Sequence, residues 1–270
     1  MSRIRVGCQT YTWEMLGEQW QGKVTDLLDW ISDAGYEGIE ITCNMIREFS
    51  ERPDDFKAEA ERRGLAVASF AYGSASGFID PDAWNDDIAG ARKWIEFLGH
   101  LPGAVLELSG ASHASRDNVF AKLDQAIKFY NHVGSLAAEA GIQAVVHPHS
   151  HHGSLLESAE EYSYLMGNTD PRCVGFCPDT GHIVRGGQDL LTCIERHIDR
   201  IRHVHLKDAT AQRKWVGLGQ GLCDYPGLLA MLEAAGYGGW VIAEEESDDA
   251  RMDGIAAINS NRQYLRSIGY

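Results

Sequence analysis

Long apolar runs are absent from this chain of 270 residues: none approaches the roughly 20 residues that a helix needs to cross a bilayer. The first six residues, MSRIRV, lead directly into a strand-like segment and do not resemble a signal sequence. We therefore expect no membrane partner and a cytoplasmic location.

Basic residues are scarce, since 24 Lys and Arg face 39 Asp and Glu, which gives a formal net charge of −15. Nucleic-acid affinity comes largely from Lys and Arg side chains that neutralise phosphates, so this balance argues against a nucleic-acid partner. Hydrophobic residues make up 44% and charged residues 23% of the chain, close to the averages for globular proteins. Neither a disordered nor a fibrous class is indicated.

Several short motifs are also missing. The six cysteines include no Cys-x-x-Cys pair, so we expect reduced, mostly buried thiols and no redox or zinc motif. The glycine-rich segment 217–221 lacks the Gly-Lys-Ser/Thr ending of a phosphate-binding loop, and we expect a flexible loop that shapes or covers a site. No Ser or Cys stands in a nucleophile-elbow pattern, which argues against a serine or cysteine hydrolase.

What the chain does contain is a regular alternation of short β-like runs and segments of helical periodicity. This alternation is typical of βα units on a parallel sheet. Glycines such as Gly35 and Gly141 mark turns out of helices, and residues 116–140 show one apolar face of a long helix. The eight runs are residues 4–9, 37–42, 65–71, 104–108, 142–147, 173–178, 202–207 and 240–244.

Eight βα units predict a (β/α)8 TIM barrel, whose typical length is about 250 residues, as a single domain over residues 1–270. No linker-like stretch suggests a second domain. An open, doubly wound sheet is the alternative. It is less favoured because TYTW at 10–13, and no Gly-x-Gly-x-x-Gly, follows the first run.

Residue types that bind metals stand at the ends of four successive runs. The fifth ends in HPH at 147–149, the sixth is followed by DTGH at 179–182, the seventh contains HVHLKD at 203–208, and the eighth ends in EEE at 244–246. The carboxyl ends of barrel strands meet at one face, where unpaired carboxylates would be costly without a cation. The four ends together therefore predict a metal site.

The segments CPDTGH at 177–182, HVHLKD at 203–208, GLGQG at 217–221 and GGWVIAE at 238–244 resemble the xylose-isomerase-like barrel superfamily. Its members include sugar isomerases and epimerases, inosose dehydratases, and endonucleases that cut at abasic sites. The resemblance implies metal ligands at Asp179, His205 and Glu244, with His182 close to the substrate or the metal.

The fourth ligand departs from the family pattern. Many members carry Glu where this chain has His147, so either His147 takes that place or Glu157 reaches back to it. We assign His147, with Asp179, His205 and Glu244, to one divalent metal ion. Mixed imidazole and carboxylate ligands suit Mn, Co, Fe or Zn better than Mg or Ca. Manganese is the first expectation, with cobalt, iron, zinc or magnesium as alternatives.

Catalytic candidates are His149, as a proton-accepting imidazole, together with Glu244 and His182. His151 and His152 are expected to be loop residues. Lys207 is a candidate substrate contact, or an internal ion-pair partner of Asp208. The remaining candidates for substrate binding have alternative structural uses in polar networks or aromatic packing; they are Gln9, Trp13, Glu40, Tyr72, Glu107, His182 and Trp215.

The expected chemistry starts with removal of a proton next to a ketone, because a divalent metal stabilises the resulting enediolate. The first hypothesis is a sugar isomerase or epimerase acting on a keto sugar with little or no charge. The alternatives are a dehydratase of the inosose dehydratase type, a 3-keto-glycoside lyase, or a barrel that only binds a sugar. An abasic-site nuclease is disfavoured by the charge. We expect a small carbohydrate as partner, and the resemblance suggests a homodimer or homotetramer.

Overall fold

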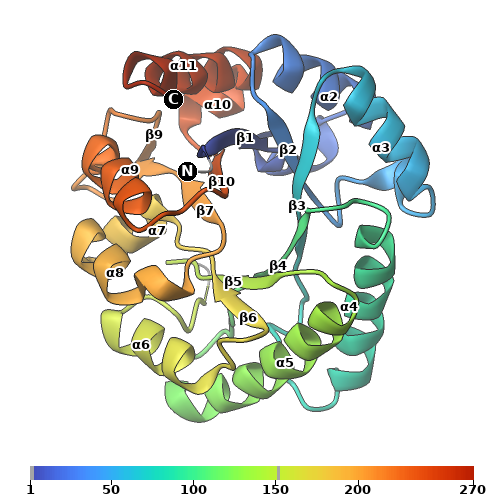
Figure 1. Ribbon diagram of the computed structural model, residues 1–270. Coiled ribbons are helices and arrows are strands. Elements are labelled where there is room, and N and C mark those ends of the chain that lie inside the picture. Colours follow the sequence, from blue (N-terminus) through green and yellow to red (C-terminus); the bar gives the residue numbers. More distant parts are fainter. Residues whose placement is uncertain (1–2, 151–152) are drawn as a thin grey trace.

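The computed structural model describes residues 3–150 and 153–270. Eight parallel strands form a central sheet that curls into a barrel, and the helices lie around its outside (Figure 1). The predicted runs are confirmed within two residues at each end. The strands are β1 (Arg5–Gln9), β2 (Gly38–Thr42), β3 (Ala66–Tyr72), β4 (Val105–Ser109), β5 (Ala144–His147), β6 (Val174–Phe176), β7 (Val204–Leu206) and β10 (Trp240–Ala243).

The strand order is β6-β5-β4-β3-β2-β1-β10-β7, so β6 and β7 are the two ends of the hydrogen-bonded series. Parallel bridges join these ends, because Arg202 N–H donates to Phe176 O at 3.1 Å and His205 N–H donates to Pro178 O at 2.9 Å. The sheet is therefore closed. The barrel prediction is confirmed, and the doubly wound alternative is wrong.

Helices return the chain from the carboxyl end of each strand to the start of the next. The predicted helix 116–140 is observed as Val119–Glu139, with Leu123 and Tyr130 fully buried. The outer elements are α1 (Tyr11–Glu14), α2 (Val24–Asp33), α3 (Pro53–Arg62), α4 (Trp84–Leu98), α5 (Val119–Glu139), α6 (Ala159–Asn168), α7 (Thr180–Arg185), α8 (Leu190–His197), α9 (Tyr225–Ala234), α10 (Asp248–Met252) and α11 (Gly254–Ser267), with the short 3₁₀ turns η1 (Gly17–Gln19), η2 (Arg47–Phe49) and η3 (Ile198–Arg200).

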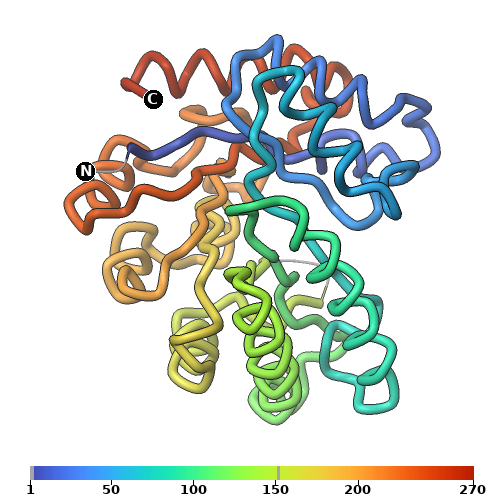
Figure 2. The backbone as a smooth tube through the Cα atoms, turned by 45° about the vertical axis from the view of Figure 1, so that its right-hand side comes forward, coloured from blue at the N-terminus to red at the C-terminus, as the bar shows by residue number. Residues whose placement is uncertain are grey.

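Figure 2 shows how the last helix lies beside the first βα units, so that both ends of the chain are on the same side of the barrel. The predicted glycine turns are present, with φ of 81° at Gly35 and 75° at Gly141, which only glycine adopts without strain. All six cysteines are free thiols. Among the described helices, none has the length and apolar character required to cross a membrane.

The core has two parts, because side chains on a strand point alternately to the helices and into the barrel. Phe70, Leu106 and Val146 belong to the large apolar cluster that the helices cover. Two small apolar clusters lie inside the barrel, as the acidic and imidazole groups do. One consists of Ala68, Trp240 and Ile242, and the other of Val105, Val145 and Cys177. The barrel interior is thus apolar at the start of the strands and polar at their carboxyl ends.

The connection after β7 is held by a carboxylate. Asp208 begins the short hairpin of β8 (Asp208–Ala209) and β9 (Trp215–Val216), and its side chain accepts N–H groups from Gly219, Gly221 and Cys223 at 2.9 to 3.1 Å. Asp208 fastens the glycine-rich segment 217–221 instead of pairing with Lys207. The loop that the sequence predicts to shape or cover the site is thus anchored to β8 through Gly219 and Gly221, and its flexibility stays a prediction.

Candidate metal centre

Four buried side chains meet at the carboxyl ends of β5, β6, β7 and β10. Each offers one ligand atom, and these atoms lie within 4.8 Å of one another. The four residues are those that the sequence predicts as ligands, namely His147, Asp179, His205 and Glu244. His147, not Glu157, takes the fourth place in this group. The convergence is a property of the fold, while metal binding by the group remains a prediction.

Two of these groups have buried polar atoms without a hydrogen bond from any described residue. Asp179 begins α7, and its Oδ1 accepts the N–H of His182 at 2.8 Å, which leaves Oδ2 without a hydrogen-bond donor. His147 Nε2 also lacks a hydrogen bond and lies 3.4 Å from that Oδ2. Buried polar atoms are almost always satisfied, so this pair fits a site for a cation.

Both imidazoles are held by carboxylates on the side away from the centre. Glu107 places Oε1 at 2.9 Å from His147 Nδ1 and Oε2 at 2.8 Å from His205 Nε2. His205 Nε2 also lies 2.9 Å from Glu40 Oε1. These contacts leave His147 Nε2 and His205 Nδ1 to face the common centre, which is the usual way in which outer carboxylates orient metal-binding histidines.

A polar layer lies beneath this centre. A register shift between Ile39 and Glu40 changes the pairing of β2 with β3, and Glu40 is fully buried. Its carboxylate accepts from Gln9 Nε2 at 2.5 Å and from the Ser69 hydroxyl, and it contacts His203 Nε2 at 2.8 Å. Glu40 therefore serves the network below the ligands and lies too deep for direct substrate contact.

The charges of this centre are balanced by protons and by one lysine. Burial opposes the charged form of His147, but Glu107 and Asp179 together outweigh it and raise the pKa of His147 to about 9. Burial likewise opposes protonation of His205, whose pKa is held well above its usual value by Glu40 and Glu107. Burial disfavours the ionised form of Glu244, yet Lys207 and His205 hold its pKa well below the usual range. A divalent cation would bring positive charge to the same place and release the imidazole protons.

Lys207 is an internal counterion. Its Nζ lies 2.8 Å from Glu244 Oε1, contacts Glu246, and lies 3.7 Å from Asp179 Oδ2. The side chain is 1% exposed. It does not line the cavity described below, and its burial behind the carboxylates indicates a role in charge balance. A substrate contact by Lys207 stays a prediction.

The two predicted catalytic histidines differ in accessibility. His149 follows β5, is half-buried, and places its ring 4.5 Å from that of His147. His182 is fully buried on α7, where its Nδ1 accepts the Ser150 N–H at 3.0 Å and its Nε2 lies 3.3 Å from Lys207 Nζ. His149 lines the cavity, whereas His182 does not, and a role for His182 in catalysis or substrate binding stays a prediction.

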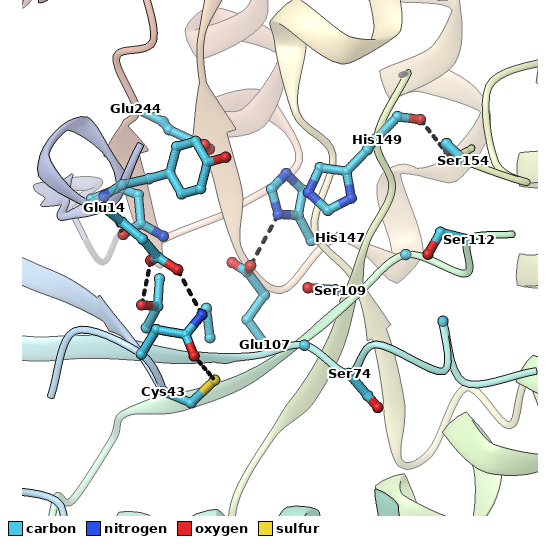
Figure 3. A pocket seen from close by; sticks show the side chains of 18 of the residues that line it. Glu14, Cys43, Ser74, Glu107, Ser109, Ser112, His147, His149, Ser154 and Glu244 are labelled. Atoms are coloured by element: carbon cyan, nitrogen blue, oxygen red, sulfur yellow. Dashed lines mark hydrogen bonds and ion pairs between the residues drawn. The ribbon is translucent and has the colours of Figure 1, made fainter. Parts of the chain in front are cut away.

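A cavity of about 300 Å³ opens beside the candidate ligands. His147, His149 and Glu244 line one part of it, as Figure 3 shows, and serines from the loops after β3 and β4 line another. Among the described residues, no Lys or Arg contributes to its wall. Its carboxylates come from Glu14, Glu107, Glu244 and Glu246. The cavity is thus polar and acidic, and it suits a ligand with many hydroxyl groups and no negative charge.

Several predicted substrate contacts have other uses in the structure. Gln9 reaches the cavity, but its amide binds Glu40 and the N–H groups of Thr10 and Tyr11. Trp13 is 4% exposed and packs on Trp30 with 5.4 Å between ring centroids, outside the cavity. Glu107 lines the cavity while its carboxylate is engaged by the two imidazoles.

Two aromatic candidates are likewise occupied by protein contacts. Tyr72 donates its hydroxyl to Asp87 O at 3.1 Å, and the ring of Trp215 lies 5.0 Å from that of His182. Neither residue lines the cavity. The expectation for His151 and His152 falls outside the described residues.

Sequence reasoning missed Tyr11 and Glu14, which line the cavity from α1. Burial, reinforced by Glu246 and Glu244, raises the pKa of Tyr11 to about 12, so its hydroxyl keeps its proton at neutral pH. The sequence placed the segment 10–13 at a pocket wall but gave no signal for these individual side chains. Helical geometry turns Trp13 toward the core and the other two toward the cavity.

Known proteins similar to this chain in sequence point to one family. The family model described as xylose isomerase-like TIM barrel matches residues 28–268. An inosose dehydratase of Geobacillus thermodenitrificans (strain NG80-2) is 29% identical over 266 residues, covering 87% of each chain. One of Lactiplantibacillus plantarum (strain ATCC BAA-793 / NCIMB 8826 / WCFS1) is 27% identical over 278 residues, covering 91% of this chain and 89% of the relative.

Solved structures agree on the fold. The IOLI protein with a binding zinc atom has a TM-score of 0.83 at 15% identity, with 98% of each chain covered. The 3-keto-D-glucoside 4-epimerase YcjR from E. coli has a TM-score of 0.78 at 17% identity, covering 98% of this chain and 100% of the other. The family model spans most of the barrel and its strand-end cluster, and the chain therefore belongs to the xylose isomerase-like TIM barrel family.

Proposed function

We propose that this protein is a divalent-metal-dependent dehydratase that removes water from an uncharged polyhydroxy ketone of the inosose type. The observation that carries this proposal is a cavity lined by His147 and Glu244, two of the four candidate ligands, whose described wall residues include no Lys or Arg. The curated relatives at 26 to 29% identity are inosose dehydratases, which supports the same reaction class.

His147, Asp179, His205 and Glu244 would hold the ion, and the buried atoms His147 Nε2 and Asp179 Oδ2 fit that role. A divalent ion bound there would polarise the ketone and stabilise the negative charge that develops on its oxygen. Mixed imidazole and carboxylate ligands favour manganese, cobalt, iron or zinc. We retain manganese as the first candidate, although the solved IOLI structure contains zinc.

Two different side chains carry out the two proton transfers of the reaction. His149, at the cavity wall, takes the proton from the carbon next to the ketone. The electron pair of that C–H bond becomes the new C=C bond as the C–O bond to the β-hydroxyl breaks. Tyr11 donates its phenolic proton to the departing hydroxyl, which leaves as water. The phenolate then takes a proton from solvent, and His149 releases its proton to solvent, so both groups return to their starting forms. Lys207 keeps Glu244 ionised throughout.

Isomerisation or epimerisation is the second candidate, because it begins with the same proton removal. In the sugar epimerases that this chain resembles, two carboxylates on opposite faces exchange the proton. Here an imidazole, His147, stands where the second carboxylate is needed, and His149 lies next to it. This asymmetry between an imidazole base and a phenol donor favours dehydration.

The test is metal content together with solvent deuterium uptake into a panel of inososes and keto sugars. We expect about one metal per chain in the wild type and in the control His100→Ala, whose ring is on the surface. His205→Ala should lose the metal and the exchange reaction. A dehydrated product establishes the lyase, and an isomeric product establishes the second candidate. Unchanged metal content in His205→Ala would overturn the ligand assignment.

A further inference from the structure

Glu14 stands at the cavity wall without belonging to the ligand group. It is the last residue of α1, and its carboxylate lines the same cavity as His147 and Glu244. Figure 3 shows it on a different side of the cavity from Ser109 and Ser112. The proposed reaction gives Glu14 no proton to move and no metal to bind.

Two neighbours fix the position of this carboxylate. The Thr42 hydroxyl donates to Oε2 at 2.5 Å, and Asn44 Nδ2 donates to Oε1 at 2.7 Å. Thr42 is anchored in turn, because its Oγ1 accepts the N–H of Met45 at 3.2 Å. Thr42 ends β2 and Asn44 follows it, whereas Glu14 ends α1, which follows β1. Loops from two strands thus hold one carboxylate in a defined direction.

The carboxylate retains capacity for further hydrogen bonds. Each of its oxygens receives one of the hydrogen bonds above, and a carboxylate accepts about four in total. Adjacent hydroxyls of a polyol can supply the remaining donors, and hydrogen bonds to a charged acceptor are stronger than those between neutral groups. Preorganisation lowers the entropy that is lost when such a ligand binds.

The charge of Glu14 also has a selective effect. Its hydrogen-bond donors Thr42 and Asn44 are neutral, and the described part of the cavity wall contains no Lys or Arg. A phosphate or carboxylate on the ligand would meet this negative charge without a cation from the wall. Hydroxyl donors are therefore favoured, and anions are repelled.

We propose that Glu14, oriented by Thr42 and Asn44, forms a second subsite that binds hydroxyl groups of the substrate away from its ketone and selects uncharged polyols over anionic ones. This inference rests on the proposed function for the identity of the substrate. The binding of a polyol at Glu14 does not itself require turnover.

The test compares Glu14→Gln with Glu18→Gln in the metal-loaded protein. Glu18 lies on η1, is exposed, and does not line this cavity, so the control removes the same charge nearby. Glu14→Gln should raise KM for the neutral ketone roughly 10- to 100-fold, as expected for a lost hydrogen bond to a charged group. Its kcat and metal content should stay close to wild type, and Glu18→Gln should behave as wild type.

Calorimetry with an unreactive neutral inositol separates this subsite from the reaction. Binding that is weakened by Glu14→Gln and unchanged by Glu18→Gln supports the subsite even if no ketone is turned over, an outcome that would reject only the proposed function. Equal binding by wild type and Glu14→Gln, or no binding by the wild type, would overturn the inference. A wild type that prefers phosphorylated ketones would overturn it as well.

Discussion

Glu107 Oε1 lies 2.9 Å from His147 Nδ1, and the other oxygen of the same carboxylate lies 2.8 Å from His205 Nε2. One buried side chain therefore orients two candidate ligands. If an amide NH2 group replaced either oxygen of Glu107, its N–H would point at the N–H of an imidazole ring, and the hydrogen bond would be lost. This pairing gives Glu107 a role in metal affinity although it is not one of the four ligands.

Replacing Glu107 by Gln should weaken metal binding about 10- to 100-fold, which is the usual cost of losing an outer carboxylate from a metal-binding histidine. Competition with a chelator of known affinity measures the effect. Glu96→Gln, an exposed change on α4, is the control. Affinity equal to wild type in Glu107→Gln would show that the imidazoles need no such orientation.

His149→Gln should retain the metal and lose the proton transfer. Because His149 is not one of the four candidate ligands but lines the cavity, we expect a fall in kcat of about 10²- to 10⁴-fold, typical for removal of a general base. Solvent deuterium exchange into the substrate reports this step directly. His113→Gln, on the exposed surface, controls for loss of an imidazole. Undiminished exchange in His149→Gln would assign the base elsewhere.

Lys207→Met should lower the free energy of unfolding by about 3 to 5 kcal/mol, because it leaves buried carboxylates without their ammonium partner. The lysine contacts Glu244 and Glu246 with its side chain 1% exposed. Denaturant titration of the metal-free protein measures the loss. The comparable change Lys93→Met removes an exposed pair with Glu51 and a cation–π contact with Trp94. If Lys207→Met lowered the free energy of unfolding no more than Lys93→Met does, the role of Lys207 as the counterion of the buried carboxylates would be contradicted.

His197 links stability to pH far from the metal centre. Burial, helped by Arg196 and Arg200, lowers its pKa to about 4, and its Nε2 has no hydrogen-bond partner among the described residues. The unfolded chain binds the proton at a higher pH than the folded chain does. The stabilisation is therefore complete above the unfolded pKa of about 6.5 and is lost as the pH falls toward 4.

His197→Phe should reduce the loss of unfolding free energy between pH 6.5 and 4. The ring packs on Phe176 with 5.5 Å between centroids, so a phenyl group matches its surroundings. Chemical denaturation of both proteins at several pH values gives the comparison. Parallel curves for wild type and variant would show that His197 does not carry this part of the acid sensitivity.

The barrel was predictable because its signals are local and repeated. Strand-like runs, helix periodicity and glycine turns recur with each βα unit, and β5 and β10 begin within two residues of the predicted places. The contact that closes the barrel between β6 and β7 has no such local sequence signal, because among the described residues it consists of two isolated bridges between distant segments. The fastening of segment 217–221 by Asp208 is also a long-range contact that composition does not encode.

The convergence of the four candidate ligands was predictable because they lie in or just after parallel strands, whose carboxyl ends meet in any barrel. The direction of a loop side chain is set by tertiary packing, and there the sequence misled: Trp13 entered the core while Glu14 entered the cavity. The same holds for Lys207, because its long side chain could reach a substrate or a carboxylate, and the sequence does not show that it lies against Glu244.

The bridge that closes the barrel pairs Asp179 with His205, two members of the candidate ligand group. An ion held by both would therefore fasten the two sheet edges to each other in addition to taking part in chemistry. Metal binding and barrel closure would then be cooperative. In the metal-free protein the backbone amides along this seam are the first place where amide hydrogen exchange should report local opening.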